Sequence, residues 1–179
     1  VGMQNIVSRE CPPLQSVVVT IGTIQGGFRN NVIAPEVKMS GTVRTLHGPT
    51  RDGMEAKIRR VFEGICRTHR GEPEFEYSYG YPVTVNDPAM ADFLAQCAAD
   101  ILGGDNVRTD AEPAMGGEDF AYIAEKVPSA YLRLGATNPA KGITAGAHNP
   151  GFDIDEDALP LGAAVMAHAA MRFVGGGKG

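Results

Sequence analysis

The spacing of hydrophobic residues changes twice between residues 37 and 85 of this chain. Residues 37–44 alternate small or apolar side chains with polar ones, which is the pattern of a half-buried β-strand. Residues 50–70 instead place their apolar side chains on one helical stripe, and Gly71 suits the C-terminal cap of that helix. Residues 75–85 return to alternation, with aromatic and valine side chains on one face. This region is therefore predicted to form a sheet covered by a helix.

Two more elements are predicted before this region. Apolar residues with helical spacing at positions 3–7 indicate that the chain begins inside a helix, which the prolines at 12–13 end. Residues 17–21 are all β-branched and predict a strand, followed by an irregular stretch over 26–35. The order helix, strand, strand, helix, strand predicts an antiparallel sheet with helices on one face, lacking its first strand and most of its first helix. We therefore expect the chain to be a fragment.

The segment Asn86-Asp87-Pro88 marks a predicted boundary, because Asp87 can cap the following helix and Pro88 suits its first position. Beyond it we expect helices and short strands to alternate in an α/β layer with too few strands for a complete domain. The first expected helix starts at Pro88 and ends at Gly103-Gly104, with its buried stripe over residues 90–101. Two further helices are expected over 118–126 and 155–173, and strands are expected over 107–109 and 130–134. The predicted fold class is α/β (α+β), with domains at residues 1–87 and 88–179 and a disordered tail over 175–179.

Charge, hydropathy and cysteine content argue against several classes of function. The net charge of -5 and the lack of a basic cluster argue against a nucleic-acid partner, which needs a basic face. No run of about 18 apolar residues occurs, so we expect no membrane span. Cys11, Cys66 and Cys97 are widely spaced, which favours buried, reduced thiols over a disulfide or a metal site. Reduced thiols fit a cytoplasmic protein.

His148 is the histidine with the most unusual surroundings. Glycine and proline residues shape its loop and could present one imidazole at a cleft. The alternative is a surface or hydrogen-bonded structural histidine, because metal sites normally show several ligands at close spacing. His47, His69 and His168 are isolated in the sequence and are interpreted as structural or surface residues.

Two further groups of residues allow both a structural and a functional interpretation. Gly116 and Gly117 precede two acidic residues at a predicted helix start. The acidic side chains can complement the helix dipole, or the glycine N–H groups can bind an anion or an oxyanion. Asn31 lies between two predicted strands, and Arg44 lies on the second one. They are either a turn residue and a solvated strand residue, or ligands of a carboxylate or carbonyl oxygen.

Four short segments, in this order along the chain, resemble the metal-dependent amidohydrolase family that contains hippurate hydrolase, aminoacylase, auxin-conjugate hydrolase and carboxypeptidase G-type enzymes. The segments are Asn31-Val32-Ile33-Ala34-Pro35, Gly41-Thr42-Val43-Arg44-Thr45, Gly116-Gly117-Glu118-Asp119-Phe120, and His148-Asn149-Pro150 with Phe152. Together they span nearly the whole chain. The Gly-Glu-Asp-Phe form is typical of the branch of hippurate hydrolases and N-acyl-L-amino-acid amidohydrolases.

The resemblance implies a catalytic α/β domain with two metal ions, interrupted by a lid domain that also dimerises. Residues 1–87 would be most of a ferredoxin-like antiparallel lid, and residues 88–179 would be the C-terminal segment of the dinuclear-metal peptidase domain. The implied reaction is hydrolysis of the linear amide bond of small N-acyl amino acids such as hippurate, by a cytoplasmic homodimer. The full-length protein would hold two divalent ions, which could be zinc, manganese, cobalt or nickel.

The resemblance also implies roles for five residues. His148 matches a metal ligand, while Asn31 and Arg44 match lid residues that contact the substrate's carbonyl and carboxylate. Gly116 and Gly117 match a loop beside the substrate. The family's other metal ligands, its general-base glutamate pair and its lid histidine have no counterpart here, so we expect no catalytic residue in this chain and no activity from the chain alone.

A non-catalytic dimerisation or interaction module is the alternative. The tyrosine-rich strand predicted over residues 75–81, beside an edge left by a missing strand, would suit pairing with a strand of another chain. This interpretation predicts association without metal. It overlaps with the first one, because the lid of the amidohydrolase family also dimerises.

Overall fold

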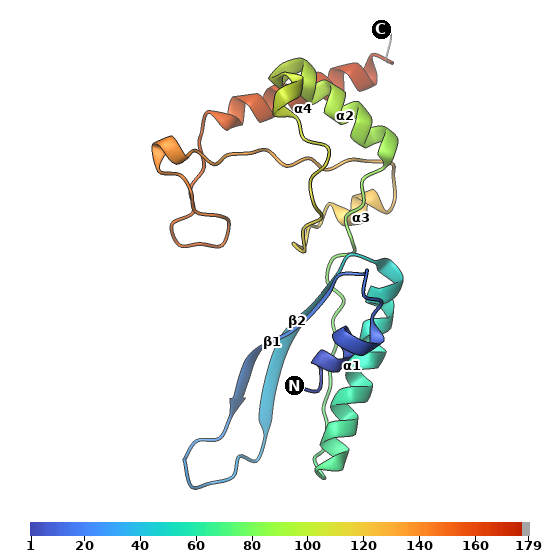
Figure 1. Cartoon of the computed structure of the whole chain (residues 1–179), viewed down its shortest axis with the longest axis vertical. Helices are drawn as coiled ribbons and strands as arrows, with labels where there is room; N and C mark the ends of the chain where they lie inside the picture. Colours follow the sequence, from blue (N-terminus) through green and yellow to red (C-terminus); the bar gives the residue numbers. More distant parts are fainter. Residues whose placement is uncertain (177–179) are drawn as a thin grey trace. The chain divides into compact units, whose positions relative to one another are not determined.

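The computed structural model describes residues 1–176, and the chain divides into two units (Figure 1). Unit 1 comprises Val1–Val83 and Pro113–Asp119, so the last of these segments lies beyond the boundary predicted at residues 87–88. Unit 2 comprises Thr84–Glu112 and the chain from Phe120 onwards. Most of the tail that we expect to be disordered, residues 177–179, lies outside the described residues.

An antiparallel hairpin forms the sheet of unit 1. Strand β1 (Val17–Gly26) pairs with strand β2 (Val37–Thr45), and Val19 lies opposite Val43. A bulge between Ile21 and Thr23 shifts the register, and residues 27–36 connect the two strands. Both predicted strands are therefore confirmed, and β1 is longer than its β-branched run.

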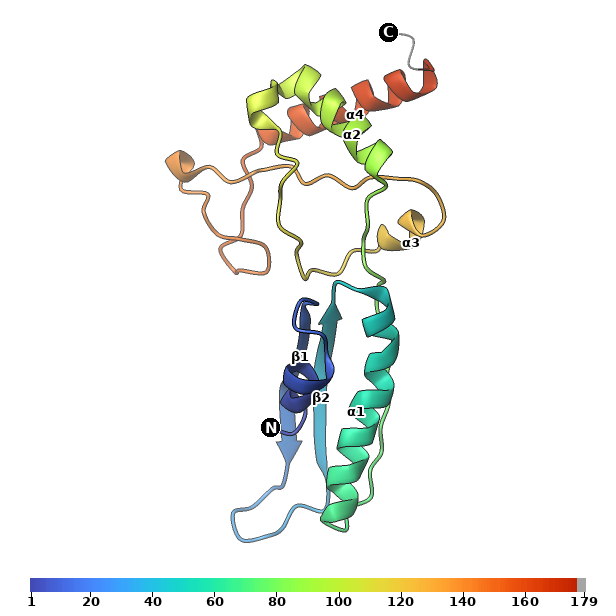
Figure 2. The ribbon, with the colours of Figure 1, turned by 45° about the vertical axis from the view of Figure 1, so that its right-hand side comes forward.

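Two helices cover one half of this hairpin. The π-helix η1 (Ile6–Glu10) and the long helix α1 (Gly48–Thr68) pack on the sheet, and Figures 1 and 2 both show α1 running alongside the strands. The core side chains are each at most 9% exposed and are Ile6, Val17, Val19, Met54 and Ile58. Burial of each large apolar side chain contributes about 1.5–3 kcal/mol, so this cluster holds the unit together. Both predicted helices are confirmed.

Helix α1 ends in a Schellman motif. The N–H of Gly71 donates to the carbonyl oxygen of Cys66 at 2.8 Å, and the N–H of Arg70 donates to that of Arg67 at 3.1 Å. The left-handed residue of this motif is Arg70, with φ of 60°, and not the glycine that follows it. Gly71 marks the end of the helix as predicted, but it lies one position past the residue that needs glycine's freedom.

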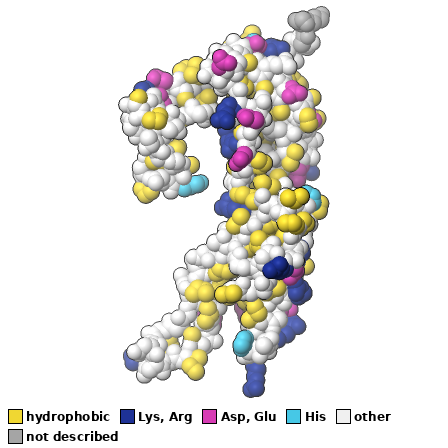
Figure 3. All heavy atoms as spheres, viewed as in Figure 1, with side chains coloured by type: hydrophobic (Ala, Val, Ile, Leu, Met, Phe, Trp, Pro, Cys, Tyr) yellow, Lys and Arg dark blue, Asp and Glu magenta, His cyan; other side chains and the backbone are white. Residues whose placement is uncertain are grey.

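The half of the hairpin next to the 27–36 connection carries solvent-exposed apolar side chains. They are between 45% and 67% exposed and are Ile21, Ile24, Val37 and Met39. Figure 3 shows hydrophobic side chains gathered over this hairpin on one face of the molecule. The predicted half-burial of β2 thus holds only near Val43 and Thr45, because no helix among the described residues covers the other half.

The strand predicted over residues 75–85 is wrong. The segment is extended and runs back along α1 in both ribbon views, but it forms no strand (Figures 1 and 2). Its alternation is real, since Phe75 and Tyr77 pack against the core of unit 1 while Glu74 and Glu76 are exposed. A strand also needs a neighbour to complete its backbone hydrogen bonds, and the described residues supply none.

Unit 2 is built mainly from two packed helices, α2 (Pro88–Leu102) and α4 (Ala158–Val174). The Asp87 carboxylate accepts a hydrogen bond from the Met90 N–H at 3.0 Å, which confirms the predicted cap of α2. Short helices lie between them: η2 (Gly104–Asn106), α3 (Ala121–Ala124) and η3 (Pro139–Lys141).

Of the α/β layer predicted for this part of the chain, the helices form but the strands do not. The segments 107–109 and 130–134 form no strands, and α3 has four residues instead of the predicted nine. The N–H of Asp87 donates to Ser129, and the Asn86 amide bonds both backbone groups of Tyr131. One backbone bond, to the Ser129 carbonyl oxygen, and two bonds of the Asn86 side chain thus hold the segment at 129–131 in place of strand pairing.

The three cysteines are free, as expected. Cys97 is buried as expected, but the expected burial is wrong for Cys11 and Cys66, which are partly exposed. No helix within residues 1–176 combines the length and the apolar character that crossing a bilayer requires.

Candidate functional site

His148 lies at an exposed position in the loop that connects η3 to α4. Its backbone has φ of 67°, a left-handed conformation that histidine adopts more readily than most residues but that is still strained. The Asn149 carboxamide accepts from the Gly151 N–H at 2.9 Å, and the Phe152 N–H donates to the Asn149 carbonyl at 2.9 Å. The turn that follows His148 is therefore well defined.

A cluster of polar side chains closes the base of this loop. The Lys141 ammonium donates to Asp155 at 2.6 Å and to Asp157 at 2.5 Å, and the Asn138 amide donates to Asp155 at 2.5 Å. Backbone bonds between Asn138 and Ile143 form an isolated bridge beside it. The side-chain contacts join residues 14 to 17 positions apart, so they hold the two ends of the loop next to each other.

The charges in this cluster stabilise one another. The hydrogen bond from Asn138, followed by that from Lys141, lowers the pKa of the Asp155 carboxyl below its ordinary value. Hydrogen bonds to Asp155 and then to Asp157 raise the pKa of the Lys141 ammonium. The Asp155 carboxylate and the Lys141 ammonium are therefore both charged at neutral pH.

The imidazole of His148 is available to a metal ion but does not form a metal site by itself. Neither ring nitrogen has a protein partner among residues 1–176, which suits a ligand. No group of three or more His, Cys, Asp or Glu side chains in that part of the chain could hold an ion. His148 thus fits one coordination position, and further ligands would have to come from elsewhere.

Arg44 lies near the end of β2 and contacts the predicted glycine loop. Its guanidinium donates to the carbonyl oxygen of Met115 at 2.6 Å, immediately before Gly116. A Cβ on Gly117 would meet the Tyr81 ring at 3.1 Å, so this loop lies close to Tyr81 within unit 1. The structure therefore places Arg44 beside the loop of Gly116 and Gly117, as one site would require.

The helix-start interpretation of Gly116 and Gly117 is wrong. Helix α3 begins at Ala121 with Phe120 as its cap residue, so neither glycine nor the acidic pair that follows lies in its first turn. A helix of four residues also has a weak dipole. Any anion bound by these glycines would have to interact with loop N–H groups.

Asn31 is exposed in the 27–36 connection, at the opposite end of the hairpin from Arg44. An extended strand rises about 3.3 Å per residue, so the stretch from Val37 to Arg44 separates the two by roughly 23 Å. The structure therefore does not bring Asn31 and Arg44 together within one chain. His148 belongs to the other unit.

Sequence reasoning missed a charged cluster between α2 and α4. Asp100 accepts hydrogen bonds from His168 at 3.0 Å and from Arg172 at 2.9 Å, and Arg172 also reaches the sulfur of the buried Cys97 at 3.8 Å. The interpretation of His168 as a structural residue is confirmed, but its partner Asp100 was not predicted. The four-residue spacing of His168 and Arg172 was a signal that both share one helix face, but not that Asp100 faces them.

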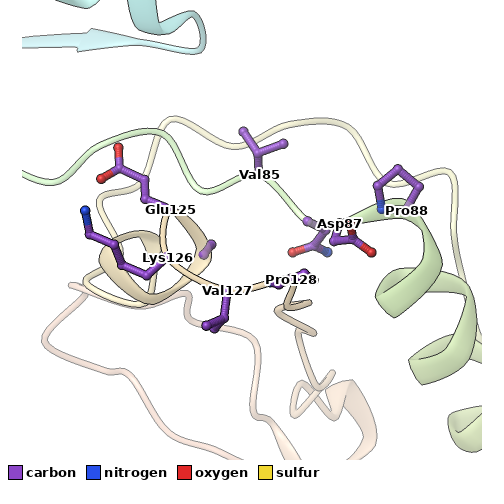
Figure 4. A pocket seen from close by; sticks show the side chains of 9 residues that line it. Val85, Asp87, Pro88, Glu125, Lys126, Val127 and Pro128 are labelled. Atoms are coloured by element: carbon purple, nitrogen blue, oxygen red, sulfur yellow. The ribbon is translucent and has the colours of Figure 1, made fainter.

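Unit 2 also has an open hollow of about 420 Å³ (Figure 4). It is lined by residues 85–88 and 124–128, and Glu125 and Lys126 are its only charged side chains besides Asp87. Asp87 is engaged as the cap of α2, and Asn86 is bonded to Tyr131. The hollow therefore lacks a histidine, a cysteine or a free acid pair that would indicate catalysis.

Comparison with known proteins finds a matching family model and similar hydrolases. The family model described as peptidase family M20/M25/M40 matches residues 6–172. The protein YhaA of Bacillus subtilis (strain 168) is 38% identical over 171 residues, which cover 96% of this chain and 43% of YhaA. IAA-amino acid hydrolase ILR1-like 4 of Arabidopsis thaliana is 33% identical over 179 residues, which cover 97% of this chain and 40% of that protein.

A solved structure is similar as well. The crystal structure of the Bacillus subtilis YXEP protein, described as a dinuclear metal binding peptidase from the M20 family, matches with a TM-score of 0.74 and 31% identity. The match covers 98% of this chain and 45% of that one. The chain is thus a mixed α/β structure that corresponds to part of a larger protein, and it spans less than half the length of these relatives.

Proposed function

We propose, from the premise that this chain belongs to peptidase family M20/M25/M40, that it is part of a metal-dependent amidohydrolase that cleaves N-acyl amino acids. The observation that carries the proposal is the match over residues 6–172, together with a relative named as an amino-acid-conjugate hydrolase. The exposed imidazole of His148 on its well-defined loop supports the assignment.

Each named residue has a chemical role in this proposal. His148 supplies one neutral imidazole ligand, and two divalent ions, completed by ligands outside this chain, would activate a water for attack on the amide carbonyl. The guanidinium of Arg44 binds the carboxylate of the amino-acid part of the substrate. Gly116 and Gly117 line the substrate, where side chains would crowd it.

The proposal also covers the domains and the partner. Residues 1–87 act as most of a ferredoxin-like lid, and residues 88–179 act as the C-terminal part of the catalytic domain. Because Asn31 and Arg44 lie at opposite ends of one hairpin, a homodimer supplies Asn31 from the second copy to the site of the first. Free thiols suit the cytoplasm as the proposed location.

The test is replacement of His148 by alanine in the full-length protein. We expect the loss of a metal ligand to lower kcat/KM for hippurate on the order of 100-fold or more, with a lower content of bound divalent ions. His69→Ala is the matched control, because this exposed histidine lies at the end of α1 in unit 1. Both variants should keep the helical circular dichroism of the parent protein.

A second function is favoured by a separate observation. The extended segment over residues 72–86 belongs to no sheet among the described residues, and the nearby hairpin carries bare apolar side chains. Both features suit a non-catalytic interaction module that pairs with another chain. Hydrolysis and metal content that are unchanged in His148→Ala would contradict the metal-ligand role of His148, and association of the chain without metal would favour this second function.

A further inference from the structure

The backbone of His148 is left-handed, and the hydrogen bonds within its own loop define only the turn that follows it. A left-handed backbone at a residue other than glycine costs about 1–2 kcal/mol and persists only where the surroundings hold it. Within the loop, the N–H groups of Asn149, Gly151 and Phe152 are bonded. None of these bonds ties the loop to another element, so the orientation of the imidazole depends on how the two ends of the loop are held.

The two ends are held by the cluster of Asn138, Lys141 and Asp155, which we name the clasp. Asp155 accepts from Asn138 with one carboxylate oxygen and from Lys141 with the other, and its own N–H donates to Ala136 at 2.8 Å. The Asp155 carbonyl in turn accepts from the Ala158 N–H at 3.0 Å, at the start of α4. The clasp therefore connects the loop to a helix that packs firmly on α2.

The Asp155 side chain is only 14% exposed, whereas Lys141 and Asp157 remain open to solvent. A nearly buried carboxylate with both oxygens bonded resists displacement by water. Asp157 accepts only from Lys141 and is therefore a peripheral member. Loss of Lys141 would leave the Asp155 carboxylate with the Asn138 amide and a longer bond from the Asp157 N–H at 3.3 Å, and loss of Asp155 would release both ends of the loop.

We propose that Lys141 and Asp155 are positioning residues, which hold the His148 loop in its metal-binding conformation before the ion arrives. This inference rests on the proposed function, in which His148 is a metal ligand. The physical reason is preorganisation, because a loop that is already ordered loses less conformational entropy when its imidazole binds an ion.

The experiment uses the full-length protein with Lys141→Met and Asp157→Asn as test variants and Lys141→Arg as the conservative variant. Asp153→Asn is the matched control, since it removes a charge from the same loop while its side chain can still accept from the Ile154 N–H. Two quantities are measured: amide hydrogen exchange of residues 142–154 in the metal-free protein, and zinc affinity by competition with a chelator.

We expect Lys141→Met to raise exchange across residues 142–154 without raising it in α2 or α4, and to lower zinc affinity about 10- to 100-fold. Asp157→Asn should change both quantities less and in the same direction. Lys141→Arg should stay near the parent protein, because a guanidinium can bridge both carboxylates. Parent-like exchange and zinc affinity in Lys141→Met would overturn the inference.

His148→Ala in the same assay separates the two proposals. If His148→Ala weakens zinc binding and Lys141→Met does not, the positioning role fails and the metal-ligand role stands. If His148→Ala leaves zinc affinity unchanged, the metal-ligand role fails, and the positioning role falls with it even where exchange shows that the clasp orders the loop.

Discussion

At the residue scale, two residues other than glycine have a left-handed backbone, Arg70 and His148, among residues 1–176. His148 has a proposed function that explains its strain, whereas Arg70 only ends α1. The Arg70 side chain has no hydrogen-bond or ion-pair partner among the described residues. We predict that Arg70→Gly raises the free energy of unfolding by about 0.5–1 kcal/mol, because glycine adopts this backbone without steric cost.

Urea unfolding followed by circular dichroism checks this value. Arg70→Ala is the control, because it removes the charge but keeps the Cβ that causes the strain. Glycine gains some entropy in the unfolded chain, so the net effect is smaller than the strain itself. A gain in Arg70→Ala equal to that in Arg70→Gly would mean that charge, and not backbone strain, is responsible.

At the element scale, α2 and α4 are joined by the cluster around Asp100 as well as by apolar packing. The hydrogen bond from His168, aided by the nearby Arg172, lowers the pKa of the Asp100 carboxyl from its ordinary value of 3.8. A carboxyl with a lowered folded-state pKa stabilises the protein above its unfolded pKa, and this contribution is lost as pH falls through the folded value.

We therefore predict that the parent protein loses more stability than Asp100→Asn as pH falls from about 5 to about 2. The measurement is urea unfolding at a series of pH values, with helical circular dichroism as the signal. Asp92→Asn, which removes a carboxylate elsewhere on α2, should keep the pH dependence of the parent. If Asp100→Asn loses stability with pH as steeply as the parent, the cluster does not contribute in this range.

At the scale of the whole molecule, the length of the hairpin decides how a complete site can form. Asn31 and Arg44 are separated by most of β2, so a site that uses both needs two copies of the chain. In the full-length protein, Asn31→Ala and Arg44→Ala should each lose most hydrolysis of hippurate. Mixed and reassembled, the two variants should recover about a quarter of the parent activity, because half the dimers are mixed and each has one intact site.

Recovery is measured after joint unfolding and refolding of equal amounts of the two variants. Each variant refolded alone is the control and should remain inactive. Absence of recovery, in mixtures shown to contain mixed dimers, would mean that Asn31 and Arg44 do not share a site across two copies.

Elements whose signals lie within a few neighbouring residues could be predicted from the sequence. Alternation and β-branching predicted β1 and β2, helical spacing predicted η1, α1 and α2, and Asp87 followed by Pro88 predicted a cap. His148 was a prediction from family resemblance, and its left-handed backbone had no sequence signal. The strands at 75–85, 107–109 and 130–134 were wrong because apolar alternation describes which face is buried, and not whether a partner strand exists.

The sequence by itself determined the two strands of the hairpin, the long helices with the cap of α2, and the family of this chain, because periodicity, caps and short motifs act over neighbouring residues. Only the tertiary structure decided which distant polar groups meet. Lys141 with Asp155, Asp100 with Arg172, and Arg44 with the Met115 carbonyl are pairs separated by 14 to 72 positions. Such pairs form only where distant segments of the chain lie side by side, and packing of the apolar cores determines which segments do.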